Sequence, residues 1–243
     1  MLDYDAEAAR YDTTRGGVPR ARAAAEAVLR LLPASAGDLL DVGCGTGLVT
    51  ERLRRPGLRV VGADASAGMA EVAAPRLDGL VVRADSLRLP FAARSFDAVC
   101  AVWLLHLLPR AADVVTEAAR LLRPGGVFVT TVDKDAGHDV GSDIDALLAP
   151  YRVSGARDAA GTITAHAARV GLRPVGETAF TGHGQGRTPR DIAADVRAGR
   201  LPSAVRTVGE DARRLADRLA TLPDPRAARP DPVYRLMAFE RIA

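Results

Sequence analysis

Short apolar runs alternate with segments of helical pattern through the first 135 residues. The apolar runs predict buried strands at 38–42, 58–63, 80–83, 96–102 and 127–132. The segments around them predict helices at 21–32, 47–55, 69–74 and 110–122, the third of them capped by Ser66. Strands that alternate with helices are typical of a parallel sheet with right-handed crossovers.

The pattern changes after residue 136. Residues 137–160 show no regular pattern, whereas 162–170 predicts a helix and 172–180 a sixth strand. Helical patterns follow at 189–199 and 203–221, and 233–242 predicts the last strand. Because the insertion over 181–231 is long for a connection between strands, we expect it to fold over the sheet edge as part of a lid.

Composition and charge are those of a globular protein of 243 residues with a formal net charge of +3. No run of about 18 apolar residues predicts a membrane span. The N-terminus lacks the apolar core of a signal peptide, so we expect a cytoplasmic protein. Lys134 is the only lysine, and the few aromatic residues do not interleave with the arginines, which argues against a nucleic-acid partner.

The cysteines and histidines predict neither a disulfide framework nor a metal site. Cys44 and Cys100, the only cysteines, are expected to be reduced thiols. His138, His166 and His183 lack metal-ligand spacing to cysteines or carboxylates.

A glycine-rich loop follows the first predicted strand. The segment 39–47, LLDVGCGTG, contains Asp41 and then glycines at alternate positions, Gly43, Gly45 and Gly47. Glycine has no Cβ and tolerates positive φ, so such a loop can turn sharply and let the backbone touch a ligand. The dinucleotide fingerprint G-x-G-x-x-G is not met, because Leu48 stands where that pattern needs its third glycine.

This D-x-G-x-G-x-G loop resembles the first motif of class I S-adenosylmethionine-dependent methyltransferases. The segment 85–97, DSLRLPFAARSFD, is similar to the D-x-x-x-L-P-F and S-F-D run of the small-molecule group related to the ubiquinone and menaquinone enzymes. Residues 105–109 and 121–126 match the same group. The resemblance covers roughly residues 5–135, and it is specific for fold and cofactor rather than for the acceptor.

Several candidate residues fall where open α/β sheets bind ligands, at the carboxyl ends of the strands. The resemblance implies that the glycine loop approaches the amino-acid part and the ribose of S-adenosylmethionine. Asp64 would accept hydrogen bonds from the ribose hydroxyls, and Asp85 with Ser86 would contact the adenine. The residues expected to hold the cofactor are Tyr11, Arg15, Asp41, Gly43, Cys44, Gly45, Gly47, Asp64, Ala65, Met69, Asp85, Ser86 and Val102.

Some of these residues have plainer interpretations that the sequence leaves open. Asp64 is alternatively a helix N-cap, Asp85 a turn residue and Met69 a core residue. The segment Tyr11 to Arg15 is similar to the family's Y-D-x-x-R, which implies that Arg15, helped by Tyr11, binds the methionine carboxylate.

His106 is the candidate catalytic residue. An imidazole titrates near neutral pH and can take a proton from a hydroxyl or amine acceptor. The family often has two adjacent histidines, and here the second position is Leu107. His106 is therefore alternatively a cofactor contact or a helix cap.

We therefore expect an α/β fold, a doubly wound, Rossmann-like three-layer sandwich with a mostly parallel seven-stranded sheet, an antiparallel last strand and a helical lid. It would form one methyltransferase domain over 1–243. Within it we expect an N-terminal helical cap (1–36), a cofactor-binding core (37–135) with its continuation (136–180), the lid insertion (181–231) and the last strand (232–243).

The expected function is methyl transfer from S-adenosylmethionine, with S-adenosylhomocysteine as product, to a small apolar or aromatic metabolite. Oxygen is the preferred acceptor atom, with nitrogen and carbon as alternatives. Rival interpretations are a cofactor-binding protein that catalyses another reaction such as cyclisation, and an RNA methyltransferase with a basic groove of Arg187, Arg190 and Arg197. We expect a monomer or homodimer with no membrane partner.

Overall fold

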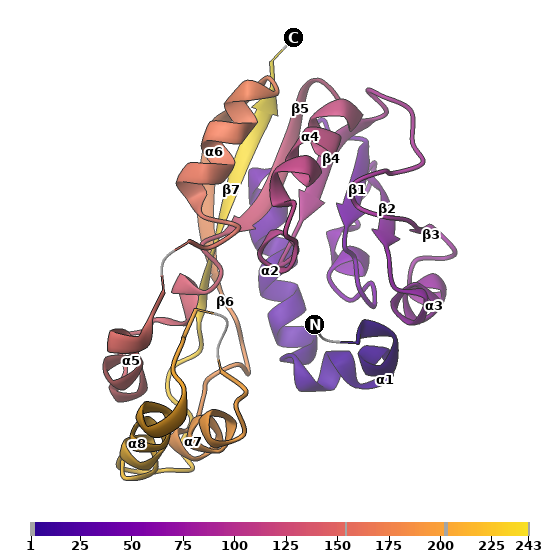
Figure 1. Cartoon of the computed structure of the whole chain (residues 1–243). Coiled ribbons are helices and arrows are strands. Elements are labelled where there is room, and N and C mark those ends of the chain that lie inside the picture. The colour runs from indigo at the N-terminus through magenta and orange to yellow at the C-terminus, as the bar shows by residue number, and fades with distance from the viewer. Residues whose placement is uncertain (1–2, 154, 202–203, 243) are drawn as a thin grey trace.

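A seven-stranded sheet with the strand order β3-β2-β1-β4-β5-β7-β6 forms the centre of the molecule (Figure 1). The computed structural model describes residues 3–153, 155–201 and 204–242. The last strand lies antiparallel between its two neighbours, which confirms the expected fold class. The strands are β1 (Asp38–Val42), β2 (Arg59–Asp64), β3 (Val81–Arg83), β4 (Phe96–Ala101), β5 (Leu122–Val132), β6 (Leu172–Thr181) and β7 (Val233–Arg241).

Helices cover both faces of the sheet. One face presents Leu39, Val60 and Val129 to α2, and the other presents Leu40 and Phe128 to α4 and α6. This alternation follows from the period of two along a strand, and it buries both faces of the parallel strands. The helices are α1 (Tyr4–Thr14), α2 (Gly17–Leu31), α3 (Ala67–Arg76), α4 (Ala111–Leu121), α5 (Asp143–Leu148), α6 (Ala160–Arg169), α7 (Pro189–Arg197) and α8 (Gly209–Ala220).

The parallel strands β2, β1, β4 and β5 end at one edge of the sheet. Val42 pairs with Ala63, Asp41 with Cys100, and Ala101 with Thr130. The loops after these strands therefore meet, and they carry most of the candidate site residues.

Three expectations for local structure are corrected. The helix predicted at 47–55 is wrong, because only a short 3-10 helix, η1 (Thr50–Leu53), forms there. Gly47 has a φ of 76°, which delays the start of a helix, and Pro56 follows closely after it. Strand β5 begins at Leu122, whereas the strand was predicted to begin at residue 127. Residues 137–160, which were expected to be irregular, contain helix α5.

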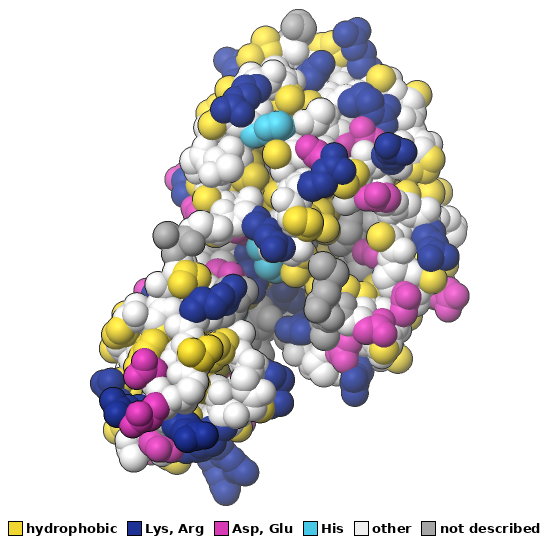
Figure 2. Space-filling model, viewed as in Figure 1, with side chains coloured by type: hydrophobic (Ala, Val, Ile, Leu, Met, Phe, Trp, Pro, Cys, Tyr) yellow, Lys and Arg dark blue, Asp and Glu magenta, His cyan; other side chains and the backbone are white. Residues whose placement is uncertain are grey.

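Helices α5, α7 and α8 form a group of their own beyond the ends of β6 and β7 (Figure 1). They share a buried cluster that includes Ile144, Ile192 and Leu215. In Figure 2 this helical group stands off from the main body with a recess between them. The expected lid insertion thus contains two helices, although residue 203, where the second was predicted to start, lies outside the described residues.

Helix α1 lies on the other side of the carboxyl edge, packed against α3 (Figure 1). Both cysteines are buried and free. Burial raises the pKa of each thiol, so both remain protonated at neutral pH. Among the described residues, no helix is both long and apolar enough to cross a membrane.

Asp97 connects β4 to the start of β1. Its carboxylate accepts hydrogen bonds from the N–H groups of Gly37 and Asp38 at 2.9 and 3.0 Å, and it pairs with Arg123 at 2.7 Å. Burial opposes ionisation, but the hydrogen bonds from Arg123, Gly37 and Asp38 outweigh it and lower the pKa of Asp97 below its ordinary 3.8.

We predict that Asp97→Ala lowers the free energy of unfolding at pH 7 by about 2 kcal/mol, because two backbone N–H groups lose their acceptor. Since the folded pKa is depressed, this contribution is fully present at neutral pH and decreases once the pH falls below the ordinary value of 3.8. Urea unfolding at both pH values measures it. Glu210→Ala, which breaks an exposed pair with Arg214 on α8, is the control and should change stability little. An equal loss at pH 7 and pH 3 would contradict the role of the charge.

Candidate active site at the carboxyl edge of the sheet

The glycine loop after β1 is held by β2. The N–H groups of Gly43 and Cys44 donate to the carbonyl of Ala63 at 2.8 and 3.1 Å, and Gly45 N–H donates to Asp64 Oδ2 at 2.8 Å. Gly45 has a φ of 55°, and a Cβ added there would meet no atom within 4 Å. The loop is therefore open beside Asp64, where a ligand can approach the backbone.

Asp64 ends β2 and joins two loops. Its second oxygen accepts from Ser66 N–H at 2.9 Å, across Ala65. Each carboxylate oxygen has a further lone pair, so the half-buried group still has acceptor capacity for hydroxyl groups of a ligand. The cap of α3 is not Asp64 but Ser66, whose Oγ accepts from Met69 N–H at 3.1 Å.

Three side chains are buried on the inner side of the loop. The exposed fractions of these residues are 3% for Asp41, 8% for Cys44 and 1% for Met69. Asp41 accepts from Thr50 Oγ1 at 2.6 Å and from Cys100 Sγ at 3.4 Å, so both its oxygens have protein donors. Burial raises the pKa of Asp41 to about 6, against the effect of those hydrogen bonds. In this conformation these side chains support the loop from inside and do not present themselves to a ligand.

Helix α1 is fastened over the loop by two of its aspartates. Asp12 accepts from Thr46 Oγ1 at 2.5 Å and pairs with Arg76 of α3 at 2.7 Å. Asp5 accepts from Ser66 Oγ at 2.5 Å and from Gly68 N–H at 2.9 Å.

This position of α1 brings Tyr4 near Asp64 and groups it with Tyr11 and Arg15. The tyrosine rings lie 6.2 Å apart, and the guanidinium of Arg15 lies 5.8 Å from the Tyr11 ring. Burial, together with the neighbouring Tyr11 and Asp64, raises the pKa of Tyr4 to about 12. No described carboxylate forms an ion pair with Arg15. Tyr4 was not predicted from the sequence, although its spacing of seven from Tyr11 places both on one face of a helix.

Asp85 and Ser86 follow β3. Asp85 is exposed, and its Oδ1 accepts from Leu87 N–H at 2.9 Å, as in a turn. Asp85 also lines a surface cavity with Arg88, Arg110 and Glu117. An adenine contact therefore remains a prediction for this pair.

The turn after β4 contains an unusual backbone conformation. Trp103 has a φ of 56°, and its N–H donates to Thr131 Oγ1 of β5 at 2.8 Å. A large side chain at positive φ is strained, and such strain is found most often at functional sites. Val102, just before it, is buried, and His106 follows on the short 3-10 helix η2 (Leu105–Leu107).

Trp103 belongs to an aromatic cluster with Phe180, Tyr234 and His138. Its ring centroid lies 5.4 Å from Phe180 and 5.5 Å from Tyr234. The Tyr234 hydroxyl donates to Gln185 Oε1 at 2.7 Å and lies 3.3 Å from His138 Nε2. The sequence did not single out this cluster, whose members come from the ends of β4, β6, β7 and the loop after β5.

Both histidines near the cluster are neutral at physiological pH. Burial is the main cause that lowers the pKa of His106 to about 4 and that of His138 to about 3, and the charges of Lys134 and Arg20 act in the same direction. His106 Nδ1 is buried without a hydrogen-bond partner. A neutral imidazole can accept a proton, but one with so low a pKa is a weak base.

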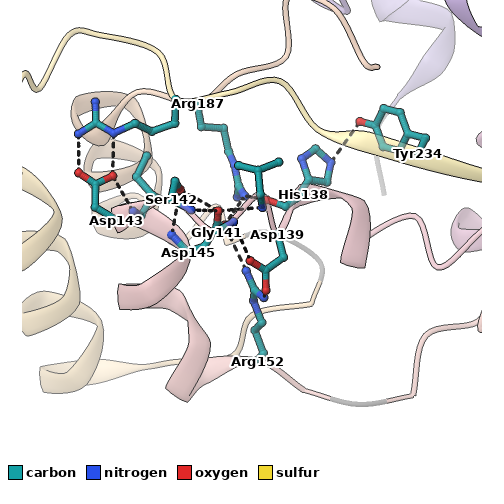
Figure 3. Close-up of polar contacts among 12 residues, drawn as sticks. His138, Asp139, Gly141, Ser142, Asp143, Asp145, Arg152, Arg187 and Tyr234 are labelled. Atoms are coloured by element: carbon teal, nitrogen blue, oxygen red, sulfur yellow. Dashed lines mark hydrogen bonds and ion pairs between the residues drawn. The ribbon is translucent and has the colours of Figure 1, made fainter. Parts of the chain in front are cut away.

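The segment that follows His138 ties the helical group to the sheet (Figure 3). Asp145, only 3% exposed, accepts from Ser142 Oγ at 2.7 Å, from Arg152 at 3.2 Å and from Arg187 at 3.5 Å. Within the described parts of the chain, no group of three or more His, Cys, Asp or Glu side chains has a geometry that could hold a metal ion.

Comparison with known proteins agrees with this geometry. Residues 40–130 match the family model of the methyltransferase domain. The chain is 35% identical over 135 residues to a demethylmenaquinone methyltransferase of Thermobifida fusca, a match that covers 52% of this chain and 57% of that protein. It is 41% identical over 105 residues to the 27-O-demethylrifamycin SV methyltransferase of Amycolatopsis mediterranei, covering 40% and 39% of the two chains.

Among solved structures, the (4+2)-cyclase SpnF superposes with a TM-score of 0.62 at 20% identity, covering 99% of this chain and 94% of that one. At this identity the likeness shows the fold alone. The resemblance to class I methyltransferases, and to the group of the menaquinone enzymes, is confirmed. The matched segments span less than two thirds of the length of these curated relatives.

We predict that Asp12→Ala loosens α1, because its contacts with Thr46 and Arg76 are both lost. Hydrogen exchange of the α1 amides should become at least about fivefold faster. Glu7→Ala, which removes the pair with Arg10 within the same helix, is the matched control. Equal exchange rates in the two variants would show that Asp12 does not hold the helix in place.

We predict that the His106 imidazole titrates near pH 4, which NMR of the histidine ring protons can follow, with the signal assigned by its loss in His106→Ala. Since the folded pKa lies below 6.5, the neutral form dominates at pH 6 and the ring becomes charged only as pH falls through about 4. A titration near 6.5 would mean that the ring is far more solvated than the structure indicates.

Proposed function

We propose that this chain transfers a methyl group from S-adenosylmethionine to a small apolar or aromatic metabolite, with oxygen as the preferred acceptor atom. The observation that carries the proposal is the hydrogen bond of Asp64 to the open glycine loop at Gly45, with the turn after β4 and its aromatic cluster beside that loop. The matching methyltransferase family model supports it.

The residues present fit this cofactor. Asp64 keeps acceptor capacity for the two ribose hydroxyls, and the loop at Gly45 has room for a ligand beside its backbone. The Arg15 guanidinium, half-buried beside the Tyr11 ring, would bind the methionine carboxylate. Asp85 and Ser86 would lie toward the adenine. Asp41, Cys44 and Met69 would act by holding the loop from beneath.

When bound, S-adenosylmethionine supplies a methyl group on a positively charged sulfur, which makes the carbon electrophilic. The protein's contribution is to hold the acceptor in line and to exclude water. The turn at Trp103 and the aromatic cluster supply an apolar surface for the acceptor. His106, which follows β4 and is neutral at pH 7, would receive the proton of a hydroxyl acceptor.

The helical group of α5, α7 and α8, together with α1, would form a lid over this edge of the sheet. The turn between α1 and α2 already meets the loop after β6, because a Cβ on Gly16 would lie 2.1 Å from the His183 carbonyl oxygen. Opening of this contact would admit the acceptor, and its closure would exclude water.

A non-methylating reaction such as cyclisation is the second candidate. The (4+2)-cyclase SpnF has the same fold, so the fold is compatible with a reaction of this kind. An RNA acceptor is not supported. Arg187 turns inward to Asp145, and Arg197 pairs with Asp217 at 2.9 Å, so these residues do not form a free basic groove.

We predict that S-adenosylmethionine and S-adenosylhomocysteine bind with micromolar dissociation constants in calorimetric titration, and that NAD does not bind. Asp64→Ala should raise the dissociation constant of S-adenosylhomocysteine at least about tenfold, because the ribose loses its acceptor. Asp78→Ala, which removes an exposed carboxylate paired with Arg54, is the control. Unchanged binding by Asp64→Ala, or binding of NAD instead, would refute the assignment.

A further inference from the structure

Arg20 is a buried cation without a carboxylate partner. Only 8% of it is exposed, and among the described residues no acid forms an ion pair with it. Its Nη1 donates to the Arg15 carbonyl at 3.0 Å, while its Nε is buried without any partner. Burial lowers the pKa of Arg20, yet an arginine stays charged at any physiological pH.

Arg20 lies at the aromatic cluster, over the ring of Trp103. Its guanidinium carbon lies 3.4 Å from the centroid of the Trp103 ring, whose edges contact Phe180 and Tyr234. Stacking on an indole attracts the cation but satisfies none of its N–H groups. The guanidinium therefore keeps an unpaired donor, its Nε–H, beside the Trp103 ring.

The other charges near the cluster are already compensated. Lys134 pairs with Asp135 at 3.1 Å, and Arg187 lies 3.5 Å from Asp145, whose oxygens also serve Ser142 and Arg152. The site thus has an excess of positive charge at Arg20. Burying an unpaired charge is costly, so a site that keeps one is suited to a ligand that brings the opposite charge.

We propose that the acceptor is an aromatic carboxylate, whose carboxylate pairs with Arg20 and whose ring packs against Trp103, Phe180 and Tyr234. A guanidinium edge binds a carboxylate through parallel hydrogen bonds, which fixes orientation as well as charge. This inference rests on the proposed function and names the acceptor class for the same site. It assigns Arg15 to the carboxylate of the cofactor and Arg20 to the carboxylate of the acceptor.

The test uses matched pairs of small ligands in calorimetric titration with the full chain saturated by S-adenosylhomocysteine. The pairs are 4-hydroxybenzoate with 4-hydroxybenzamide, 3-phenylpropanoate with its amide, and indole-3-acetate with indole-3-acetamide. At least one carboxylate should bind about tenfold or more tightly than its amide. In Arg20→Met the preference should fall below about twofold, while the affinity for S-adenosylhomocysteine changes less than about twofold.

Arg15→Met is the matched control, with the reverse expectation of weakened S-adenosylhomocysteine binding and an intact carboxylate preference. If Arg20→Met melts below the temperature of the titration, Arg20→Lys replaces it. That variant keeps the charge without the planar donor edge, and it should lose at least about threefold of the preference.

Three outcomes overturn the inference: no carboxylate preference in the wild type, a preference that survives Arg20→Met, or an Arg20→Met variant that loses S-adenosylhomocysteine as Arg15→Met does. Failure of the wild type to bind S-adenosylhomocysteine at all would instead refute the proposed function, so the two failures are distinguishable.

Discussion

The carboxylate of Asp64 connects the two loops on which the site is built. Because parallel strands β1 and β2 end side by side, one side chain can accept from Gly45 N–H at 2.8 Å and from Ser66 N–H at 2.9 Å. The first bond fixes the glycine loop, and the second fixes the start of α3, which in turn holds α1 through Arg76 and Asp12. The Asp64 carboxylate would therefore have two tasks. It holds both loops in place, and it would also accept hydrogen bonds from the ribose.

Several aspartates are bound by donors within the protein, whereas two arginines near the candidate site have no carboxylate partner in the described part of the chain. Asp12, Asp41, Asp97 and Asp145 are all engaged by protein donors and hold elements together. Arg15 and Arg20 form no ion pair with any described carboxylate. At the carboxyl edge, Asp64 remains available to hydroxyl groups of a ligand, whereas Arg15 and Arg20 remain available to anionic groups.

Local pattern was enough to predict most of the sheet and the parts of the site that adjoin it. The strand at 38–42 and Ser66 as the cap of α3 need only their own neighbours in sequence, and both are confirmed. The helix at 47–55 failed because the positive φ of Gly47 overrides helical propensity. Arg20 and Tyr234 could not be predicted, because their meeting at Trp103 depends on how α2 and β7 pack across the sheet.

The same packing links binding of the acceptor to its chemistry. Arg20 is among the charges that lower the pKa of both His106 and His138. Burial is the main cause of both low pKa values, and the charge of Arg20 is only a minor one. A carboxylate paired with Arg20 would compensate this minor contribution and leave the imidazoles buried. The contribution of Arg20 to methyl transfer would therefore be to hold the acceptor in position, because a paired guanidinium fixes the orientation of a carboxylate.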